Sequence, residues 1–199
     1  MRIIAGTFRS RLLNSLKGLD LRPTSDRLRE TLFDILGDLV GGSRFIDAFA
    51  GTGAVGIEAL SRGAAEAIFI EKYPAAVALI KKNLQSLDIK SSNRVLPIDA
   101  LRGLELLSKE ASTLRGALHI IFLDPPYAQA ADYGRVLSFL GSASLFPAGS
   151  VVIAEHRRKF QLPEIVQSLQ RVRVLHQGDA SLSFYRLRSE AATAAPAKQ

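Results

Sequence analysis

The sequence predicts an α/β fold built on a mostly parallel sheet with an antiparallel last strand. Two observations carry this prediction: strands and helices alternate from Arg44 onward, and the alternation ends in a hairpin around Gly178-Asp179. Alternating strands and helices form a parallel sheet covered on both faces, whereas a hairpin adds its second strand antiparallel. Before this pattern, Ile3-Ile4 and Leu12-Leu13 read as short strands with turns at Gly6 and Gly18.

The elements follow from apolar spacing and from their end signals. A first helix is expected from about Ser25, because leucines recur at helical spacing until Gly41-Gly42 stops it. Pro74 takes the favoured first position of another helix. The main domain covers 23–188, and the Ala/Pro/Lys-rich residues 189–199 are expected to be disordered. Further helices are expected over 54–62, 74–87, 100–107, 130–140 and 163–169, and strands over 44–49, 67–70, 94–98, 118–123, 150–154, 172–176 and 182–187.

Composition narrows the class of protein. The chain has 199 residues, no cysteine and a net charge of +7, with no apolar run long enough to span a membrane. We therefore expect a cytoplasmic, single-domain monomer without disulfides, and no metal site, because the three histidines are too dispersed. Residues 1–30 alone carry a net charge of +4, which indicates a polyanionic partner or a solvated basic arm.

A glycine loop follows the first main strand. Gly51, Gly53 and Gly56 form a G-x-G-x-x-G pattern between a strand and a helix, and Glu71 lies twenty positions after Gly51 at the next strand end. This spacing satisfies the dinucleotide fingerprint, in which the acid binds ribose hydroxyls. The pattern indicates that a nucleoside binds here but does not identify it. The alternative is a purely structural strand–turn–helix connection whose glycines only permit tight packing.

Asp47 favours S-adenosylmethionine over a dinucleotide. A carboxylate directly before the glycines would repel a pyrophosphate, whereas it would attract the α-ammonium of S-adenosylmethionine, which has no phosphate. Glu71 would then hold the ribose, and Asp99, at the following strand end, would lie near the adenine. The candidate cofactor-binding residues are Asp47, Phe49, Gly51, Thr52, Gly53, Glu71, Lys72, Asp99 and Ala100.

The catalytic candidates are Asp124, Pro125, Pro126 and Tyr127, which follow an apolar strand. Two prolines end the strand and make a rigid loop. This loop resembles motif IV of the amino methyltransferases, which methylate exocyclic amines of nucleobases. The Asp124 side chain and a backbone carbonyl beside Pro125 would accept hydrogen bonds from the amine and free its lone pair, while Tyr127 would stack on the base. The loop does not distinguish adenine, cytosine and guanine as the base that is methylated.

The N-terminal segment narrows the choice by resemblance. The stretches 1–6, 9–13 and 21–33, together with 45–53 and the Asp-Pro-Pro-Tyr loop, resemble the RsmD family over residues 1 to about 188. That family methylates the N2 amine of guanine 966 in bacterial 16S ribosomal RNA. The resemblance implies a Rossmann-like S-adenosylmethionine-dependent methyltransferase fold with a small basic N-terminal β-hairpin extension over residues 1–22. It further implies a folded small-subunit particle as substrate. It also implies RNA contacts by Arg9, Arg11 and Arg22, and places Thr24 near the cofactor.

Three other functions remain open at this point. An adenine-N6 methyltransferase acting on DNA or RNA could use the same loop. A non-catalytic RNA-binding assembly factor could keep the fold, although the intact Asp124-Pro125-Pro126-Tyr127 loop argues against it. A nicotinamide-dependent oxidoreductase would use the glycine loop, but Asp47 disfavours it.

Overall fold

The computed structural model describes residues 1–15, 25–110, 119–126, 131–142, 147 and 149–188. The helices are α1 (Asp26–Leu36), the 3-10 turn η1 (Gly37–Leu39), α2 (Ala54–Ser61), α3 (Pro74–Ser86), α4 (Ala100–Lys109) and α5 (Ala131–Ser142). The strands are β1 (Arg44–Asp47), β2 (Glu66–Ile70), β3 (Asn93–Leu96), β4 (His119–Leu123), β5 (Val151–Arg157), β6 (Ile165–Val166), β7 (Leu169–Gln177) and β8 (Ala180–Leu187).

All eight strands form one sheet in the order β3-β2-β1-β4-β5-β8-β7-β6. Strands β1 to β5 pair in parallel, whereas β8 pairs antiparallel with β5, and β7 pairs antiparallel with β8. The predicted mostly parallel sheet with an antiparallel last strand is therefore confirmed. The order reverses between β1 and β4, which is the point where ligands bind in open sheets of this kind.

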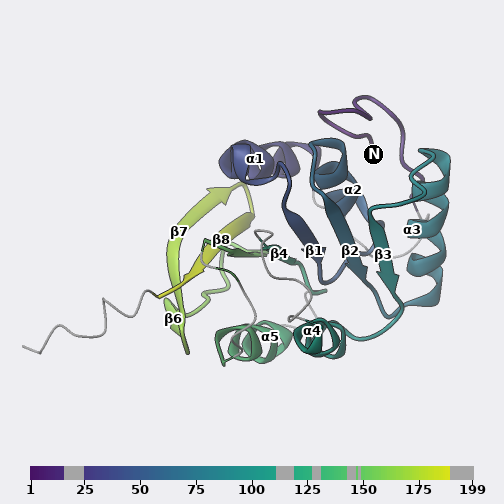
Figure 1. Ribbon diagram of the computed structural model, residues 1–199. Helices are drawn as coiled ribbons and strands as arrows, with labels where there is room; N and C mark the ends of the chain where they lie inside the picture. The colour runs from purple at the N-terminus through teal and green to yellow at the C-terminus, as the bar shows by residue number, and fades with distance from the viewer. Residues whose placement is uncertain (16–24, 111–118, 127–130, 143–146, 148, 189–199) are drawn as a thin grey trace, which may run out of the picture.

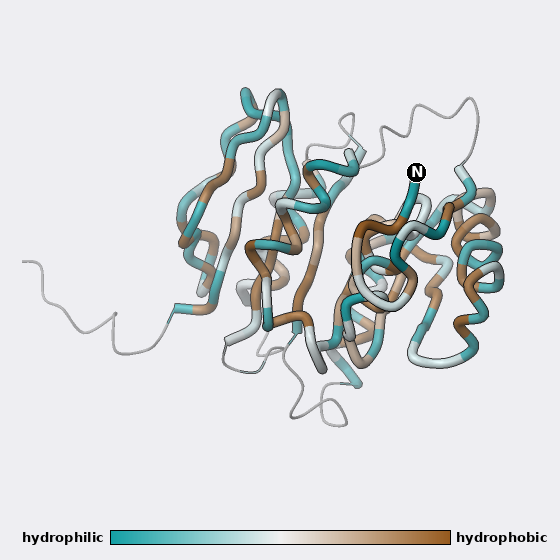
Figure 2. Tube along the Cα trace, turned by 90° about the horizontal axis from the view of Figure 1, so that it is seen from above, coloured by the Kyte–Doolittle hydropathy of each residue, from teal (hydrophilic) through white to brown (hydrophobic). Residues whose placement is uncertain are grey.

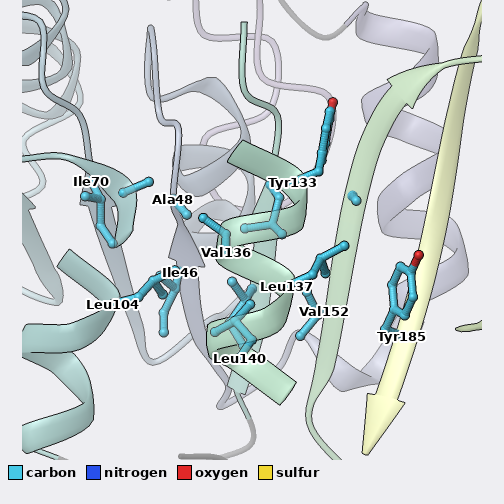
Figure 3. Packing of buried hydrophobic residues seen from close by; sticks show 14 of the residues in the cluster. Ile46, Ala48, Ile70, Leu104, Tyr133, Val136, Leu137, Leu140, Val152 and Tyr185 are labelled. Carbon is cyan, nitrogen blue, oxygen red and sulfur yellow. The ribbon is translucent and has the colours of Figure 1, made fainter. Parts of the chain in front are cut away.

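Helices cover both faces of the sheet (Figure 1). Helices α4 and α5 pack on one face through a cluster that includes Ile46, Ile70, Leu104, Leu137 and Val152 (Figure 3). Helices α1, α2 and α3 cover the other face in two further clusters. In Figure 2 the helices alternate between brown and teal along their turns, as amphipathic elements do. Each fully buried aliphatic side chain contributes about 1.5–3 kcal/mol relative to exposure.

Helix α1 begins and ends where the sequence signals it. The Ser25 hydroxyl accepts a hydrogen bond from the Leu28 backbone N–H at 3.1 Å, which caps the first turn. At the other end Gly37 has a positive φ of 50° and leads into η1, so the helix expected from Ser25 is shorter than the apolar spacing suggests. None of the helices among the described residues is long and apolar enough to cross a membrane.

The helix expected over 163–169 is wrong. Residues 165–166 form β6 and Leu169 begins β7, joined by a two-residue turn in which Gln167 has a φ of +55°. The apolar spacing of this segment fits a helix as well as a short hairpin, and contacts outside it decide. The Ser168 N–H donates to the Gly141 carbonyl at 3.2 Å, so the turn is fixed against the end of α5.

The N-terminal extension doubles back on itself over residues 1–15. The pairing consists of a single antiparallel bridge between Arg2 and Leu12, with hydrogen bonds from Ile3 N–H to the Arg11 carbonyl at 3.0 Å and from Leu13 N–H to the Met1 carbonyl at 3.1 Å. We call residues 1–15 the N-terminal arm. Ile3 and Leu13 anchor the arm in the cluster formed by α2, α3 and the sheet. The tail 189–199 lies outside the described residues.

Candidate active site

The acids of the predicted site gather at the carboxyl edge of the parallel strands. Asp47 is the last residue of β1 and is in register with Phe69 of β2 and Phe122 of β4. Glu71 and Asp124 therefore each lie two residues beyond Asp47 on the two strands that flank β1. Because the carboxyl ends of parallel strands meet at one edge of the sheet, Asp47, Glu71 and Asp124 lie close together there, as the sequence predicts.

The glycine loop links this edge to α2. Gly51 and Gly53 have positive φ angles of 51° and 78°, and Gly53 caps α2. Gly56 serves packing, because a Cβ atom there would lie 2.4 Å from a ring carbon of Phe69. Each glycine of the predicted pattern thus has a physical reason, two for backbone conformation and one for close contact between helix and sheet.

Glu71 holds the loop against β2. One carboxylate oxygen accepts the Gly51 N–H at 2.8 Å, and the other accepts the Tyr73 N–H at 2.8 Å. The side chain is buried, with 8% exposure. A carboxylate has about four acceptor positions, so these two bonds leave acceptor capacity for a ligand hydroxyl.

Asp47 is a buried acid with a raised pKa. Its side chain is buried, and one oxygen accepts the Gly56 N–H at 3.1 Å. Burial, against the lowering effect of the Gly56 hydrogen bond and together with the charges of Glu71 and Glu155, raises the pKa of Asp47 from 3.8 to about 7. Burial and the neighbouring acids disfavour the ionised form of this carboxyl group. A cationic ligand beside it would stabilise that form.

The remaining cofactor candidates differ in whether their side chains can reach a ligand. Asp99 caps α4 by accepting the Leu101 N–H at 3.1 Å, and it stays half-buried. Phe49 is also half-buried beside the α4 cluster, and Lys72 is exposed with its ammonium 5.3 Å from the centre of the Tyr73 ring. Ala100, in contrast, points into the hydrophobic cluster, so only its backbone could face a ligand.

The reaction loop begins directly after β4. Asp124 and Pro126 are half-buried and Pro125 is buried, while Tyr127 lies outside the described residues. The neighbouring strand contributes Glu155, which no sequence motif marks although it is also an acid near a strand end. Glu155 is buried, and its carbonyl accepts a hydrogen bond from the Tyr133 hydroxyl, which fixes α5 against this edge.

A buried asparagine connects the N-terminal arm to the glycine loop. The Asn83 side chain of α3 accepts hydrogen bonds from both the backbone and side-chain N–H groups of Asn14, at 2.8 and 3.0 Å. It donates to the carbonyls of Asn14 at 3.2 Å and Thr52 at 3.0 Å. No sequence pattern selects Asn83, because its partners are 69 and 31 residues away along the chain.

The predicted RNA contacts lie partly on the arm. Arg9 and Arg11 are exposed, and Arg11 donates to the Ser86 carbonyl at 3.2 Å. Arg22 and Thr24 lie outside the described residues. Gly6 allows the arm to approach α2, since a Cβ atom at its φ of +80° would lie 1.8 Å from the Ser61 carbonyl oxygen.

Within the described ranges, no group of three or more His, Cys, Asp or Glu residues could hold a metal ion. His119 lies in the core strand β4 with 2% exposure, as predicted. Burial, which disfavours the charged ring, and nearby Arg44 together lower its pKa to about 4 against the opposing effect of Glu66. A buried neutral histidine at the amino end of β4 is remote from the acids at the carboxyl edge.

The sheet order, the glycine loop after β1 and the strand-end acids define the Rossmann-like methyltransferase class. Residues 1–186 match the family described as Conserved hypothetical protein 95, and the chain belongs to that family. The resemblance to the RsmD family is thereby confirmed, because a relative named ribosomal RNA small subunit methyltransferase D aligns with 79% of the chain.

Relatives match the chain along most of its length. The protein YlbH of Bacillus subtilis (strain 168) is 35% identical over 188 residues, which cover 94% of this chain and 100% of YlbH. The ribosomal RNA small subunit methyltransferase D of Buchnera aphidicola subsp. Acyrthosiphon pisum (strain APS) is 33% identical and covers 79% and 78%. The solved structure of yhhF from Escherichia coli has a TM-score of 0.78 at 29% identity, covering 96% of this chain and 99% of that one.

Proposed function

We propose that this protein transfers a methyl group from S-adenosylmethionine to the N2 amine of guanine 966 of 16S ribosomal RNA in the small ribosomal subunit. The single observation that carries the proposal is the site around Asp47. A buried carboxyl group with a raised pKa lies beside a glycine loop and two residues short of Glu71 and Asp124 on the flanking strands.

The residues at this edge fit the cofactor. Bound S-adenosylmethionine would supply a methyl group activated by its sulfonium. Asp47 would bind the α-ammonium, which compensates the buried charge, and Glu71 would accept hydrogen bonds from the ribose hydroxyls. Asp99 would accept from the adenine amine. Phe49, Gly51, Thr52, Gly53 and Lys72 would line the same site, with the backbone of Ala100 closing it.

The reaction loop would activate the amine. Asp124 and a backbone carbonyl next to Pro125 would accept one hydrogen bond each from the two N–H groups, which localises the lone pair on nitrogen. The rigid prolines Pro125 and Pro126 would hold these acceptors in place, and Tyr127 would stack on the base. Asp124 would take the proton that nitrogen loses after transfer.

The choice of guanine in ribosomal RNA rests on the family and on charge. The Buchnera relative is named for the small-subunit ribosomal RNA, and the chain belongs to the same family. The exposed Arg9 and Arg11 on the N-terminal arm would contact RNA phosphates, together with Arg22. The protein would act as a monomer in the cytoplasm, on a folded particle rather than on free RNA.

The direct test supplies labelled S-adenosylmethionine with small subunits from cells that lack the gene, free 16S ribosomal RNA and DNA side by side. We expect label in guanine N2 of the small subunit. Asp124→Ala should abolish transfer and keep RNA binding, while Asp88→Ala, an exposed acid far from the site, should keep both. Label on adenine would favour an adenine-N6 methyltransferase, binding without transfer would favour an assembly factor, and transfer by Asp124→Ala would disprove the role of Asp124.

A further inference from the structure

A second basic region lies at the end of the sheet remote from the N-terminal arm. Residues 157–188 hold seven Lys or Arg side chains against Glu164 and Asp179, a net charge of +5. Residues 1–30 carry a further +4, and the chain between the two regions is net acidic. The positive charge of the protein is therefore concentrated in these two regions. Figure 1 shows the arm near α2 and α3 and the β7–β8 hairpin at the opposite end of the sheet.

The part of this region nearest the candidate active site is the turn Arg157–Phe160, which follows β5. The Phe160 N–H donates to the Arg157 carbonyl at 2.9 Å, which closes the turn. The Arg158 N–H donates to the Asp179 carbonyl at 2.7 Å and ties the turn to the β7–β8 connection. The backbone is thus fixed at two points, although the side chains of Arg158 and Lys159 are exposed.

Phe160 gives this turn an aromatic surface. Its side chain keeps 37% exposure, while the ring lies 5.4 Å from the Tyr133 ring and 6.4 Å, edge-on, from the His156 ring. Two aromatic neighbours hold the ring in one orientation and leave part of it open to solvent. Exposed rings beside cations are the combination that binds single-stranded nucleic acid, by base stacking and phosphate contact.

The turn lies close to the reaction loop. Strands β4 and β5 are parallel neighbours, with Leu123 in register with Ala154. Asp124 is one residue beyond this pair and Arg157 is three residues beyond it. With strands about 4.8 Å apart and a rise of about 3.3 Å per residue, the turn begins roughly 8 Å from Asp124. RNA that presents a base to Asp124 would pass within reach of the turn.

We propose that the turn Arg157–Phe160 is a second RNA-binding element of this protein. Arg158 and Lys159 contact phosphates that flank the target nucleotide, and Phe160 stacks on a neighbouring unpaired base. The N-terminal arm and this turn then hold the RNA on both sides of the site. The inference rests on the proposed function, since it takes ribosomal RNA as the ligand.

The test compares two double variants with equal loss of charge. Arg158→Ala with Lys159→Ala removes the exposed cations of the turn. The control, Lys90→Ala with Lys109→Ala, removes two exposed cations from the amino-end side of the sheet. Binding to small subunits and to a target-site RNA fragment is measured across a salt series. We expect the turn variant to bind about tenfold more weakly, with a salt slope lower by about 2, because each lost phosphate contact removes about 1.

A kinetic readout separates binding from chemistry. The turn variant should raise the KM for small subunits and leave kcat and the affinity for S-adenosylmethionine unchanged. Phe160→Leu, which keeps apolar packing against Tyr133, should weaken RNA binding without changing the salt slope. Equal losses in the two double variants, or none in either, would overturn the proposal. A loss confined to the particle and absent from the RNA fragment would point to a ribosomal protein and overturn it as well.

Failure of the proposed function is distinguishable. If the wild-type protein methylates no ribosomal RNA, the function itself is wrong, whatever the variants bind. If the wild-type protein methylates the small subunit and the turn variant matches it in KM and salt slope, only the second RNA-binding element is wrong.

Discussion

Two regions of this protein bury a carboxylate, and they treat it in opposite ways. At the arm docking site, Glu58 is fully buried and its oxygens accept the N–H groups of Ile4 and Ala5 at 2.8 and 3.0 Å. Its charge is matched by Arg62 at 2.8 Å and by buried Arg29 at 3.7 Å. This carboxylate is surrounded by donors and cations from three parts of the chain.

At the strand-end site, Asp47 is equally buried but has little compensation. Among the described residues, the Gly56 N–H donates a hydrogen bond to its carboxylate. Its neighbours include two further acids, Glu71 and Glu155. The surroundings of the two carboxylates distinguish a structural charge from a functional one. The compensated carboxylate fixes the arm to α2, whereas the poorly compensated one, which has no cationic partner among the described residues, would be stabilised by a bound cation.

The largest effect is expected from breaking the compensated region. Glu58→Ala removes the buried acid beside Arg29, which keeps its ion pair with Asp26, and releases two backbone N–H groups of the arm. We therefore expect a loss of about 3–5 kcal/mol in the free energy of unfolding. Denaturant titration measures it, and proteolysis would detect release of residues 1–15. The control Glu164→Ala removes an exposed partner of Arg171 and should cost no more than about 1 kcal/mol. A loss that small for Glu58→Ala would show that this carboxylate does not hold the arm against α2.

The opposite sign is expected at Asp47. Unfolded, this carboxyl ionises near 3.8, whereas in the folded protein its pKa is about 7. The free energy of unfolding therefore falls as the pH rises from 3.8 to 7, and the full cost is present above 7. Asp47→Asn carries no charge and should be more stable than the wild type at pH 8, by up to about 4 kcal/mol. The gain should shrink toward zero as the pH falls to 4. Thermal unfolding at several pH values measures it, and a destabilised variant at pH 8 would contradict the prediction.

A smaller effect is expected where the two regions meet, at Asn83. Asn83→Ala removes hydrogen bonds to Asn14 and to the Thr52 carbonyl, which should cost about 1–3 kcal/mol of stability. Because Thr52 belongs to the glycine loop, the Kd for S-adenosylmethionine should also rise about tenfold. This change corresponds to a loss of about 1.4 kcal/mol in binding free energy. Ser86→Ala, which loses only a bond within α3, serves as the control. An unchanged Kd in Asn83→Ala would show that the arm and the loop are independent.

Much of the fold and of the site could be predicted because the signals are local. Apolar spacing, helix caps and glycine positions set the alternation of β1 to β5 with their helices, and strand ends carry Asp47, Glu71 and Asp124 to one edge. The segment 163–169 could not be predicted, since Gly141 fixes its turn and no local pattern reports that contact.

The parts that sequence patterns missed depend on distant contacts. Asn83 joins segments 69 residues apart, and Glu155 enters the site only because β5 lies beside β4. The compensation of Glu58 by Arg29 is likewise invisible along the chain, although both residue types are plain in the sequence. The chemistry of a buried charge depends on its surroundings, which only the folded structure provides.

The role of Asp47 is tested most directly by calorimetry of S-adenosylmethionine binding in buffers of different ionisation enthalpy, at pH 6 and pH 8.5. If the bound α-ammonium stabilises the ionised form of Asp47, whose pKa is about 7 without ligand, binding should release close to one proton at pH 6 and almost none at pH 8.5. Asp47→Asn should abolish the release and weaken binding, and NAD should not bind. Tight binding of NAD, or the same proton release in Asp47→Asn, would contradict the assignment of Asp47 as the acid that binds a cationic cofactor.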